Sequence, residues 1–223
     1  MSMLVSDYDG TFKGSVTSNL ELSLNIKAVK EYMKKGNTFV IATGRPYISI
    51  KKEIDFYDIP YDYLICNDGS TVFDRNNLIH SNHLNDDITK ELISVIEDMK
   101  IEYSLYNHIG KTRSIKDIVE IALLVKNMEN YRKMKDAISD FNDLCIDKLY
   151  RNAFIRKNCH KDYGIDVLCN MIGNIDNIYT IGNDKNDVEM LKKYDGYKVL
   201  LSYLHDNSIK TVSTVSTLVK KII

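Results

Sequence analysis

Residues 3–11 read Met3-Leu4-Val5-Ser6-Asp7-Tyr8-Asp9-Gly10-Thr11. The three apolar residues predict a short buried strand, and the polar residues after them predict a turn at its end. The same change from apolar to polar occurs where residues 39–42 precede Thr43-Gly44-Arg45 and where residues 178–181 precede residues 182–187. In open α/β sheets the ligand crevice lies beyond the carboxyl ends of the strands, so these three loops are expected to surround one site.

The segments around these strands predict an α/β domain with a parallel sheet. Residues 20–35 have apolar side chains at helical spacing, and Gly36 is expected to end that helix. Strands alternate with helices in this part of the chain, which is typical of βαβ units. Further elements are expected over residues 48–55 (helix), 63–66 (strand), 162–171 and 188–193 (helices), 198–201 (strand) and from residue 213 (helix).

The middle of the chain has a different pattern, which predicts a small α+β domain with an antiparallel sheet. Residues 102–106 and 112–115 are expected to pair across a turn. Other elements are expected over residues 86–99 and 127–141 (helices) and 119–125, 145–150 and 153–156 (strands). We therefore assign residues 1–78 and 158–223 to a core domain and residues 79–157 to a domain inserted into it.

The composition excludes several classes of function. Lys and Arg total 30 and Asp and Glu total 31 in 223 residues, so the net charge of -1 gives no overall field that attracts nucleic acid or an anionic membrane. No apolar stretch reaches the roughly 18 residues of a membrane span, and the N-terminal residues do not resemble a signal peptide. The cysteines form no C-x-x-C pair and are expected to be reduced: Cys66, Cys145, Cys159 and Cys169. We expect a cytoplasmic protein, a monomer or weak homodimer, without nucleic-acid or membrane partners.

The polar loops contain the residue types that phosphoryl transfer needs. Asp7, Asp9 and Asp187 in one crevice would repel one another, and a divalent cation such as Mg²⁺ would relieve that repulsion. An ionised Asp7 can attack phosphorus, while Asp9 can act first as general acid and then as general base. The hydroxyl of Thr43 can hold phosphate oxygens, and Lys161 can offset charge on the transferring group. Asp7, Asp9, Thr43 and Lys161 are thus the predicted catalytic residues.

Neighbouring residues are predicted to bind a small phosphorylated metabolite. Gly10 lets the backbone turn closely, and the Thr11 hydroxyl and nearby N–H groups can hold phosphate oxygens. The complete predicted set is Gly10, Thr11, Gly44, Arg45 and Asn186. Two alternatives to Lys161 are Lys157 and Lys185. Four residues near the expected hairpin tip either select the substrate or form a solvated loop: Tyr106, His108, Lys111 and Arg113.

These residues resemble the four motifs of the haloacid dehalogenase (HAD) superfamily. The motif D-x-D-G-T matches residues 7–11, the Thr or Ser after a strand matches Thr43, the lysine matches Lys161, and G-D-x-x-N-D nearly matches residues 182–187. The insert lies between the second and third motifs, as in members with a C2-type cap. Thr-Gly-Arg and Asn67-Asp68-Gly69 are most similar to the Cof-type subgroup with IIB caps.

The resemblance implies a HAD-like Rossmannoid core with an α+β cap. It also implies an Mg²⁺-dependent phosphatase that hydrolyses small phosphomonoesters, such as sugar phosphates or related metabolites, through an aspartyl-phosphate intermediate. A phosphomutase similar to phosphomannomutases and a degenerate phosphate-binding regulatory protein are the alternatives.

One position departs from the family pattern. The family usually has Asp, a direct magnesium ligand, where this chain has Asn183. An amide oxygen can ligate magnesium but supplies no charge, so weaker binding is expected. Either Asn183 or Asp184 is expected to complete the metal shell. The predicted metal ligands are Asp7, Asp9, Asn183, Asp184 and Asp187.

Overall fold

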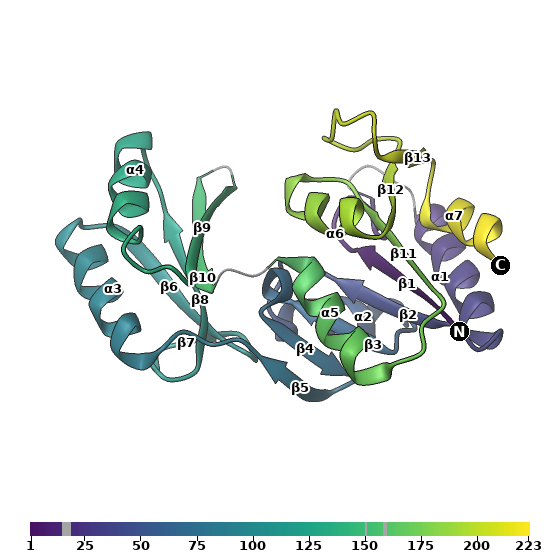
Figure 1. Ribbon diagram of the computed structural model, residues 1–223, viewed down its shortest axis with the longest axis horizontal. Coiled ribbons are helices and arrows are strands. Elements are labelled where there is room, and N and C mark those ends of the chain that lie inside the picture. Colours follow the sequence, from purple (N-terminus) through teal and green to yellow (C-terminus); the bar gives the residue numbers. More distant parts are fainter. Residues whose placement is uncertain (15–18, 150, 158–159) are drawn as a thin grey trace.

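The computed structural model describes residues 1–14, 19–149, 151–157 and 160–223. Within these residues the chain forms one sheet of eight strands and one of five (Figure 1). The larger sheet takes strands from both ends of the chain, and the smaller sheet takes its strands from residues 102–157. We call the parts of the molecule around the larger and smaller sheets the core and the cap.

The core sheet has the strand order β13-β12-β11-β1-β2-β3-β4-β5. Strands β13 to β3 are parallel, and β4 and β5 add an antiparallel hairpin at one edge. The predicted parallel α/β fold is thus confirmed. The strands are β1 (Ser2–Asp7), β2 (Thr38–Ala42), β3 (Tyr63–Cys66), β4 (Thr71–Asp74), β5 (Asn77–Ser81), β11 (Asn177–Gly182), β12 (Asp195–Val199) and β13 (Lys210–Val212).

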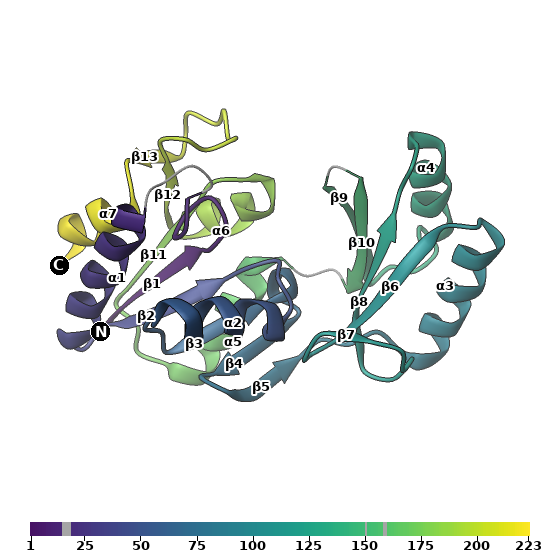
Figure 2. The same cartoon turned by 180° about the vertical axis from the view of Figure 1, so that it is seen from behind.

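Helices cover both faces of the core sheet (Figures 1 and 2). One face packs against α1 (Asn19–Lys34), α2 (Tyr47–Tyr57) and α7 (Val215–Ile222). The other face packs against α5 (Lys161–Ile172) and α6 (Val188–Lys193). Since both faces are covered, β2 is buried at every position, which explains the apolar run from Phe39 to Ala42.

The cap sheet is antiparallel, with the order β7-β6-β8-β10-β9. Its two helices pack on the face that is turned away from the core (Figure 1). Alternate residues of a strand point to opposite faces, so Glu120, Phe154 and Arg156 lie on the face toward the core. The elements are α3 (Asp86–Asp98), β6 (Glu102–Asn107), β7 (Lys111–Thr112), β8 (Ile118–Leu124), α4 (Met128–Ala137), β9 (Leu144–Leu149) and β10 (Asn152–Lys157).

Several expected elements differ from the structure. The β4–β5 hairpin was not predicted, and β5 spans the boundary that we placed at residue 78. The strand expected at residues 112–115 is reduced to the two residues of β7, which pair with Leu105 and Tyr106 of β6. The helix expected over residues 127–141 ends at Ala137.

The bounds expected for the strand at residues 198–201 were also wrong, since β12 spans Asp195–Val199. Leu200 and Leu201 continue the apolar run in sequence, but their side chains are 68% and 73% exposed. The strand lies earlier, because Tyr179 to Gly182 of β11 pair with residues 195–198. Pairing with the neighbouring strand, rather than local hydrophobicity, therefore sets the bounds of β12, and β13 was not expected at all.

None of the helices in the described part of the chain is long and apolar enough to cross a lipid bilayer. Cys66 is a buried free thiol and Cys169 a half-buried one. Cys159, Tyr150 and the predicted start of the returning core segment at residue 158 lie outside the described residues.

Candidate active site

The strand register brings the three predicted loops together at one edge of the core sheet. Asp7 pairs with Ala42 of β2, and Ser6 pairs with Ile181 of β11. The loops that follow β2 and β11 therefore flank the end of β1. The register explains how motifs more than 130 residues apart in the sequence reach one site.

A buried lysine joins two of the carboxylates. Lys161, at the start of α5, is 0% exposed, and its Nζ donates to Oδ1 of Asp7 at 2.7 Å and to Oδ1 of Asp187 at 2.6 Å. Burial lowers the pKa of Lys161, but Asp187 and Asp7 raise it by more, so the ammonium stays charged. Of the three lysines considered from the sequence, Lys161 is the one that these contacts place beside Asp7. We call Asp7, Lys161 and Asp187 the Lys161 cluster.

The carboxyl group of Asp7 holds its proton more tightly than an ordinary aspartate. Burial and the nearby Asp187 raise the pKa of Asp7 to about 7, although Lys161 acts in the opposite direction. The cluster has two carboxylates and one ammonium, so one negative charge is left without a partner inside the cluster. An additional cation at Asp7 would favour its ionised form.

Asp9 is paired with Arg45. Its two carboxylate oxygens accept from Nε and Nη2 of Arg45 at 2.7 and 2.6 Å. The Asp9 side chain is 52% exposed, and both residues line the same cleft as Asp7. The carboxylate that we predicted as a metal ligand is therefore held by Arg45 in this structure, and it is the backbone oxygen of Asp9 that lies next to Asn183.

The side-chain amide of Asn183 lies against the first motif. With its nitrogen turned toward Asp7, it donates to Asp7 Oδ2 and the Asp9 carbonyl at 3.1 Å each and to Thr11 Oγ1 at 3.2 Å. Gly10 makes this approach possible, because a Cβ there would lie 2.2 Å from a terminal atom of the Asn183 amide. Gly10 also has φ +82°, a left-handed conformation that favours glycine.

Asp187 shapes the loop that carries Asn183. Its Oδ2 accepts from the backbone N–H of Asn183 at 2.8 Å and of Asp184 at 3.1 Å, while Oδ1 accepts from Lys161. Both carboxylate oxygens of Asp187 therefore support this loop and Lys161 in the structure, and its role as a metal ligand stays a prediction. Asp184 accepts from the backbone N–H of Lys185 at 2.7 Å and lines the cleft.

The second motif lies next to Asp68, in the 3₁₀ turn η1 (Asn67–Gly69) after β3. Thr43 is buried, and its Oγ1 accepts from the backbone N–H of Arg45 at 3.1 Å. A Cβ at Gly44 would lie 3.1 to 3.2 Å from the Asp68 carboxylate oxygens. Asn186, predicted to bind phosphate, donates from Nδ2 to Asp68 Oδ1 at 2.8 Å. Asp68 is thus a central residue that we did not predict as part of the site.

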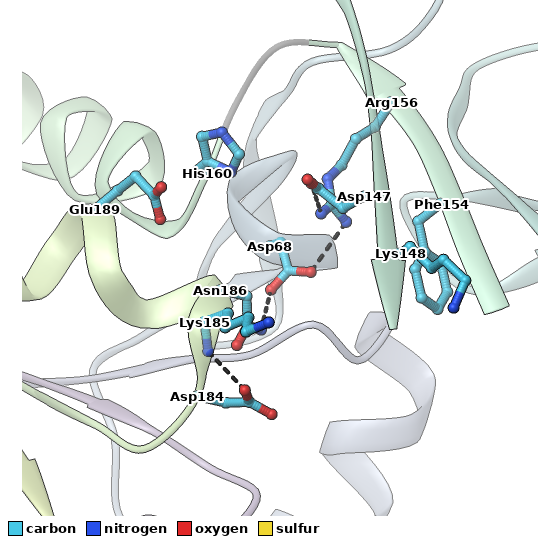
Figure 3. A pocket seen from close by; sticks show the side chains of 10 residues that line it. All are labelled: Asp68, Asp147, Lys148, Phe154, Arg156, His160, Asp184, Lys185, Asn186 and Glu189. Atoms are coloured by element: carbon cyan, nitrogen blue, oxygen red, sulfur yellow. Dashed lines mark hydrogen bonds and ion pairs between the residues drawn. The ribbon is translucent and has the colours of Figure 1, made fainter. Parts of the chain in front are cut away.

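A cleft of about 240 Å³ lies between core and cap. The core contributes Asp7, Asp9, Thr43 and neighbouring loop residues, and the cap contributes Glu120 and Phe154. A second hollow of about 200 Å³ adjoins the cleft beyond Asp68 (Figure 3). The residues of the expected hairpin tip do not line either space within the described part of the chain.

Arg156 of the cap is a second buried cation surrounded by carboxylates. It is 2% exposed, and its Nη1 donates to Asp68 at 3.0 Å while its Nη2 donates to Asp147 at 2.7 Å (Figure 3). Its Nη1 also donates to Glu120 at 3.2 Å. Burial raises the pKa of Glu120 to about 7, against the effect of Arg156 and with a further contribution from Asp68. We call Asp68, Glu120, Asp147 and Arg156 the Arg156 cluster.

Two residues of the Arg156 cluster could have been recognised from the sequence as candidate buried charges. Glu120 is a charged residue inside an apolar strand, and Asp68 lies in a polar turn that directly follows a strand. Buried charges are normally paired, so each should have a partner. The partner cannot be identified from the sequence, because it depends on how the cap is placed against the core.

The residues near Asp7 fit one magnesium ion. The Asn183 amide lies 3.1 Å from Asp7 Oδ2 and 3.1 Å from the Asp9 carbonyl, and carboxylate, carbonyl and amide oxygens are all ligands that magnesium accepts. No group of three or more His, Cys, Asp or Glu side chains in the described residues is arranged to hold a metal. A site here therefore depends on the backbone oxygen of Asp9 and on Asn183 rather than on additional carboxylates.

Solved structures have the same fold. A phosphatase of the haloalkanoate (HAD) enzyme superfamily from Bacteroides thetaiotaomicron matches with a TM-score of 0.81 and 20% identity over 100% of this chain and 94% of that chain. A HAD subclass IIB sugar phosphatase matches with a TM-score of 0.76 and 18% identity over 100% of this chain and 98% of that chain. At these identities the likeness shows the fold.

Sequence comparison agrees with the fold. The family model described as haloacid dehalogenase-like hydrolase matches residues 4–115 and 107–220. A relative from Buchnera aphidicola subsp. Schizaphis graminum, named "Putative phosphatase", is 24% identical over 225 residues, which cover 85% of this chain and 80% of the relative.

Fold and site together define a HAD-type protein, with a parallel core sheet and a cap inserted between its second and third motifs. The chain belongs to the haloacid dehalogenase-like hydrolase family, and it is a Cof-type member, as its motifs predicted.

Proposed function

We propose that this hydrolase is an Mg²⁺-dependent phosphatase that cleaves small phosphomonoesters through an aspartyl-phosphate at Asp7. The observation that carries the proposal is the buried ammonium of Lys161 between Asp7 and Asp187, with Asp7 lining a cleft to which the cap also contributes. A fixed positive charge beside a carboxylate nucleophile can stabilise the charge that develops on a transferring phosphoryl group.

The reaction has two steps in this proposal. The Asp7 carboxylate forms a bond to phosphorus as the bond from phosphorus to the leaving oxygen breaks, and Asp9 gives that oxygen a proton. Water then attacks the aspartyl-phosphate, Asp9 accepts the proton of the water, and inorganic phosphate is released with Asp7 restored. Asp9 must leave Arg45 to reach the leaving oxygen, so the pair at 2.6 and 2.7 Å is a resting arrangement.

Magnesium would be held by Asp7, the backbone carbonyl of Asp9 and Asn183, whose amide would turn its oxygen toward the ion, with Asp184 close by. A bound ion supplies positive charge that keeps Asp7 ionised and offsets the charge of the phosphate. Thr11, Thr43 and the backbone of the first two loops would hold phosphate oxygens.

We propose sugar phosphates or related metabolites as substrates. The cleft of about 240 Å³ is suited to a small molecule rather than a polymer, and a solved structure with the same fold is a HAD subclass IIB sugar phosphatase. We also propose that the enzyme acts in the cytoplasm as a monomer or weak homodimer, which agrees with the free thiols of Cys66 and Cys169.

The test is phosphate release by the purified protein from a panel of sugar phosphates, nucleotides and pyridoxal phosphate with Mg²⁺. Asp7→Asn is expected to lower kcat by roughly a thousandfold or more, because the amide is a poor nucleophile. Asp58→Asn, at an exposed residue paired with Lys30, is the matched control and should retain full activity. Full activity of Asp7→Asn would exclude Asp7 as the nucleophile. An isomerised sugar phosphate as product would indicate a mutase, and binding without turnover would indicate a binding protein.

A second prediction concerns the metal. Asn183→Asp adds a charged oxygen next to Asp7, so it should lower the Mg²⁺ dissociation constant by roughly tenfold, or about 1.4 kcal/mol. Isothermal titration calorimetry with Mg²⁺ alone measures this without turnover. An unchanged dissociation constant would show that residue 183 does not ligate the ion.

A further inference from the structure

The Asp68 side chain connects three parts of the molecule. Its Oδ2 accepts from Arg156 of cap strand β10 at 3.0 Å, and its Oδ1 accepts from Asn186 in the loop after β11 at 2.8 Å. Its backbone N–H donates to the Thr43 carbonyl at 3.1 Å. One residue therefore contacts the cap, the loop that carries Asn183, and the second motif.

The backbone at Asp68 is in an unfavourable conformation. Its φ of 49° and ψ of 40° are left-handed, a region that glycine adopts readily and that raises the energy of most other residues. The neighbouring Asn67 also has φ 49°. A glycine would fit this backbone better but would remove the carboxylate. Aspartate is among the residue types that tolerate this conformation, and at this position it also supplies the carboxylate that Arg156 and Asn186 contact.

The electrostatics of the contact favour a charged Asp68. Although burial acts to raise its pKa, Arg156 and then Lys161 lower the pKa of Asp68 below its ordinary value. Its ionised carboxylate is thus shared between a guanidinium on the cap and an amide on the core loop. A charged hydrogen bond to each side is stronger than a neutral one, and it is lost when the cap moves away.

We propose that Asp68 is a positioning residue that couples closure of the cap, through Arg156, to the order of the loop at residues 183–187. When the cap is seated, Arg156 fixes the Asp68 carboxylate, which holds Asn186 and with it the loop that presents Asn183 and Asp184. When the cap opens, Asp68 loses its charged partner and the loop loses one of its tethers. The catalytic part of this inference rests on the proposed function, and the structural part does not.

Hydrogen exchange of the loop at residues 183–187 tests the coupling directly. The N–H groups of Asn183 and Asp184 donate to Asp187, so their exchange reports whether the loop is ordered. Arg156→Gln is the main variant. Within the described residues the Arg156 guanidinium donates to Asp68, Glu120 and Asp147, so its effect on the loop must pass through Asp68.

Arg156→Gln and Asp68→Asn should each speed exchange of the loop by at least fivefold, and the double variant should add little to either. Arg156→Lys should restore part of the protection. Asp147→Asn is the matched control, since it also removes a carboxylate from Arg156 but lies wholly within the cap, and its loop should exchange as in the wild type. Thermal unfolding confirms that each variant is folded.

Wild-type exchange in Arg156→Gln would overturn the inference, whether or not the protein is a phosphatase. If the wild type turns over phosphomonoesters, Asp68→Asn should also lower kcat about tenfold with a smaller change in KM, because the loop order is needed in the transition state. If Asp68→Asn changes neither kcat nor hydrogen exchange of residues 183–187, the proposed coupling is wrong, and the proposed function is unaffected. Absence of turnover in the wild type would contradict the proposed function and leave the exchange test standing.

Discussion

The Lys161 cluster and the Arg156 cluster are built on the same plan in two regions of the molecule. Each has one buried cation and more carboxylates than that cation can neutralise. In each, one carboxyl has its pKa raised to about 7, Asp7 in the first and Glu120 in the second, and burial is the main cause.

The clusters differ in where their members lie. The Lys161 cluster is made of core residues, so it is present whatever the cap does. The Arg156 cluster joins three cap residues to Asp68 of the core, so it is complete only when the cap is seated. The comparison suggests that the first cluster supplies the charge for chemistry and that the second reports the position of the cap.

Removal of Lys161 should have the largest effect. Lys161→Met leaves Asp7 and Asp187 buried without their cation, so the free energy of unfolding at neutral pH should fall by about 3 to 5 kcal/mol. Phosphate release should also be lost. Urea denaturation at pH 7 measures the first effect, and the loss should be smaller at pH 5, below the raised pKa of Asp7 of about 7.

The matched variant in the other cluster is Arg156→Met. It should lower the free energy of unfolding less, by about 1 to 2 kcal/mol, because the cap can open and let water reach the three carboxylates. Equal losses of unfolding free energy in the two variants would contradict this comparison. They would mean that opening the cap costs as much free energy as unfolding the whole protein.

Most of the core could be predicted from the sequence, because its strands are continuous apolar runs that each end in a polar loop. The failures have local reasons. The β5 strand has exposed or half-buried residues throughout and therefore lacks an apolar signal. Leu200 and Leu201 extend an apolar run in the sequence, which predicted a strand, but both residues are exposed in the structure.

The residues near Asp7 could be predicted for the same reason, since each lies directly after a strand or at the start of a helix. Asp68, Glu120 and Arg156 could not be assigned partners, because their contacts join segments whose relative placement is set by the whole cap. The position of Asn186 shows the same limit. Its place in the loop was expected, but its contact with Asp68 was not.

The next prediction concerns the raised pKa of Glu120 and its effect on stability. Burial raises its pKa from an ordinary 4.5 to about 7 in the folded protein, with Arg156, Asp68 and Tyr106 as the titratable groups that face it. Between these pH values the unfolded chain releases the proton and the folded protein keeps it, so this group's contribution to stability is present below pH 4.5 and is lost as the pH rises to about 7.

Glu120→Gln removes this titratable group, and with it the pH-dependent contribution of residue 120 to stability. The stability of the variant relative to the wild type should rise between pH 5 and pH 8, by on the order of 1 to 3 kcal/mol, and this is measured by urea denaturation at both pH values. A difference that stays constant with pH would show that Glu120 titrates normally. The two clusters would then differ in electrostatics as well as in location.

The smallest effect is expected for the exposed ion pair between Asp9 and Arg45. It serves as a reference for the two buried clusters. Asp9 and Arg45 form a two-point ion pair as short as the buried contacts, but their side chains are 52% and 31% exposed. Water already solvates both groups, so Arg45→Met should change the free energy of unfolding by only about 0 to 1 kcal/mol, and 0.5 M NaCl should reduce that difference further. Arg45 also lies 3.7 Å from Glu53, a half-exposed ion pair that methionine loses, and over the ring of Tyr8, where methionine keeps part of the packing. If Arg45→Met lowers the free energy of unfolding by more than about 2 kcal/mol in urea denaturation, then distance rather than burial determines the strength of these ion pairs. The predicted order of stability losses, with Lys161 first, Arg156 second and Arg45 last, would then be wrong for Arg45.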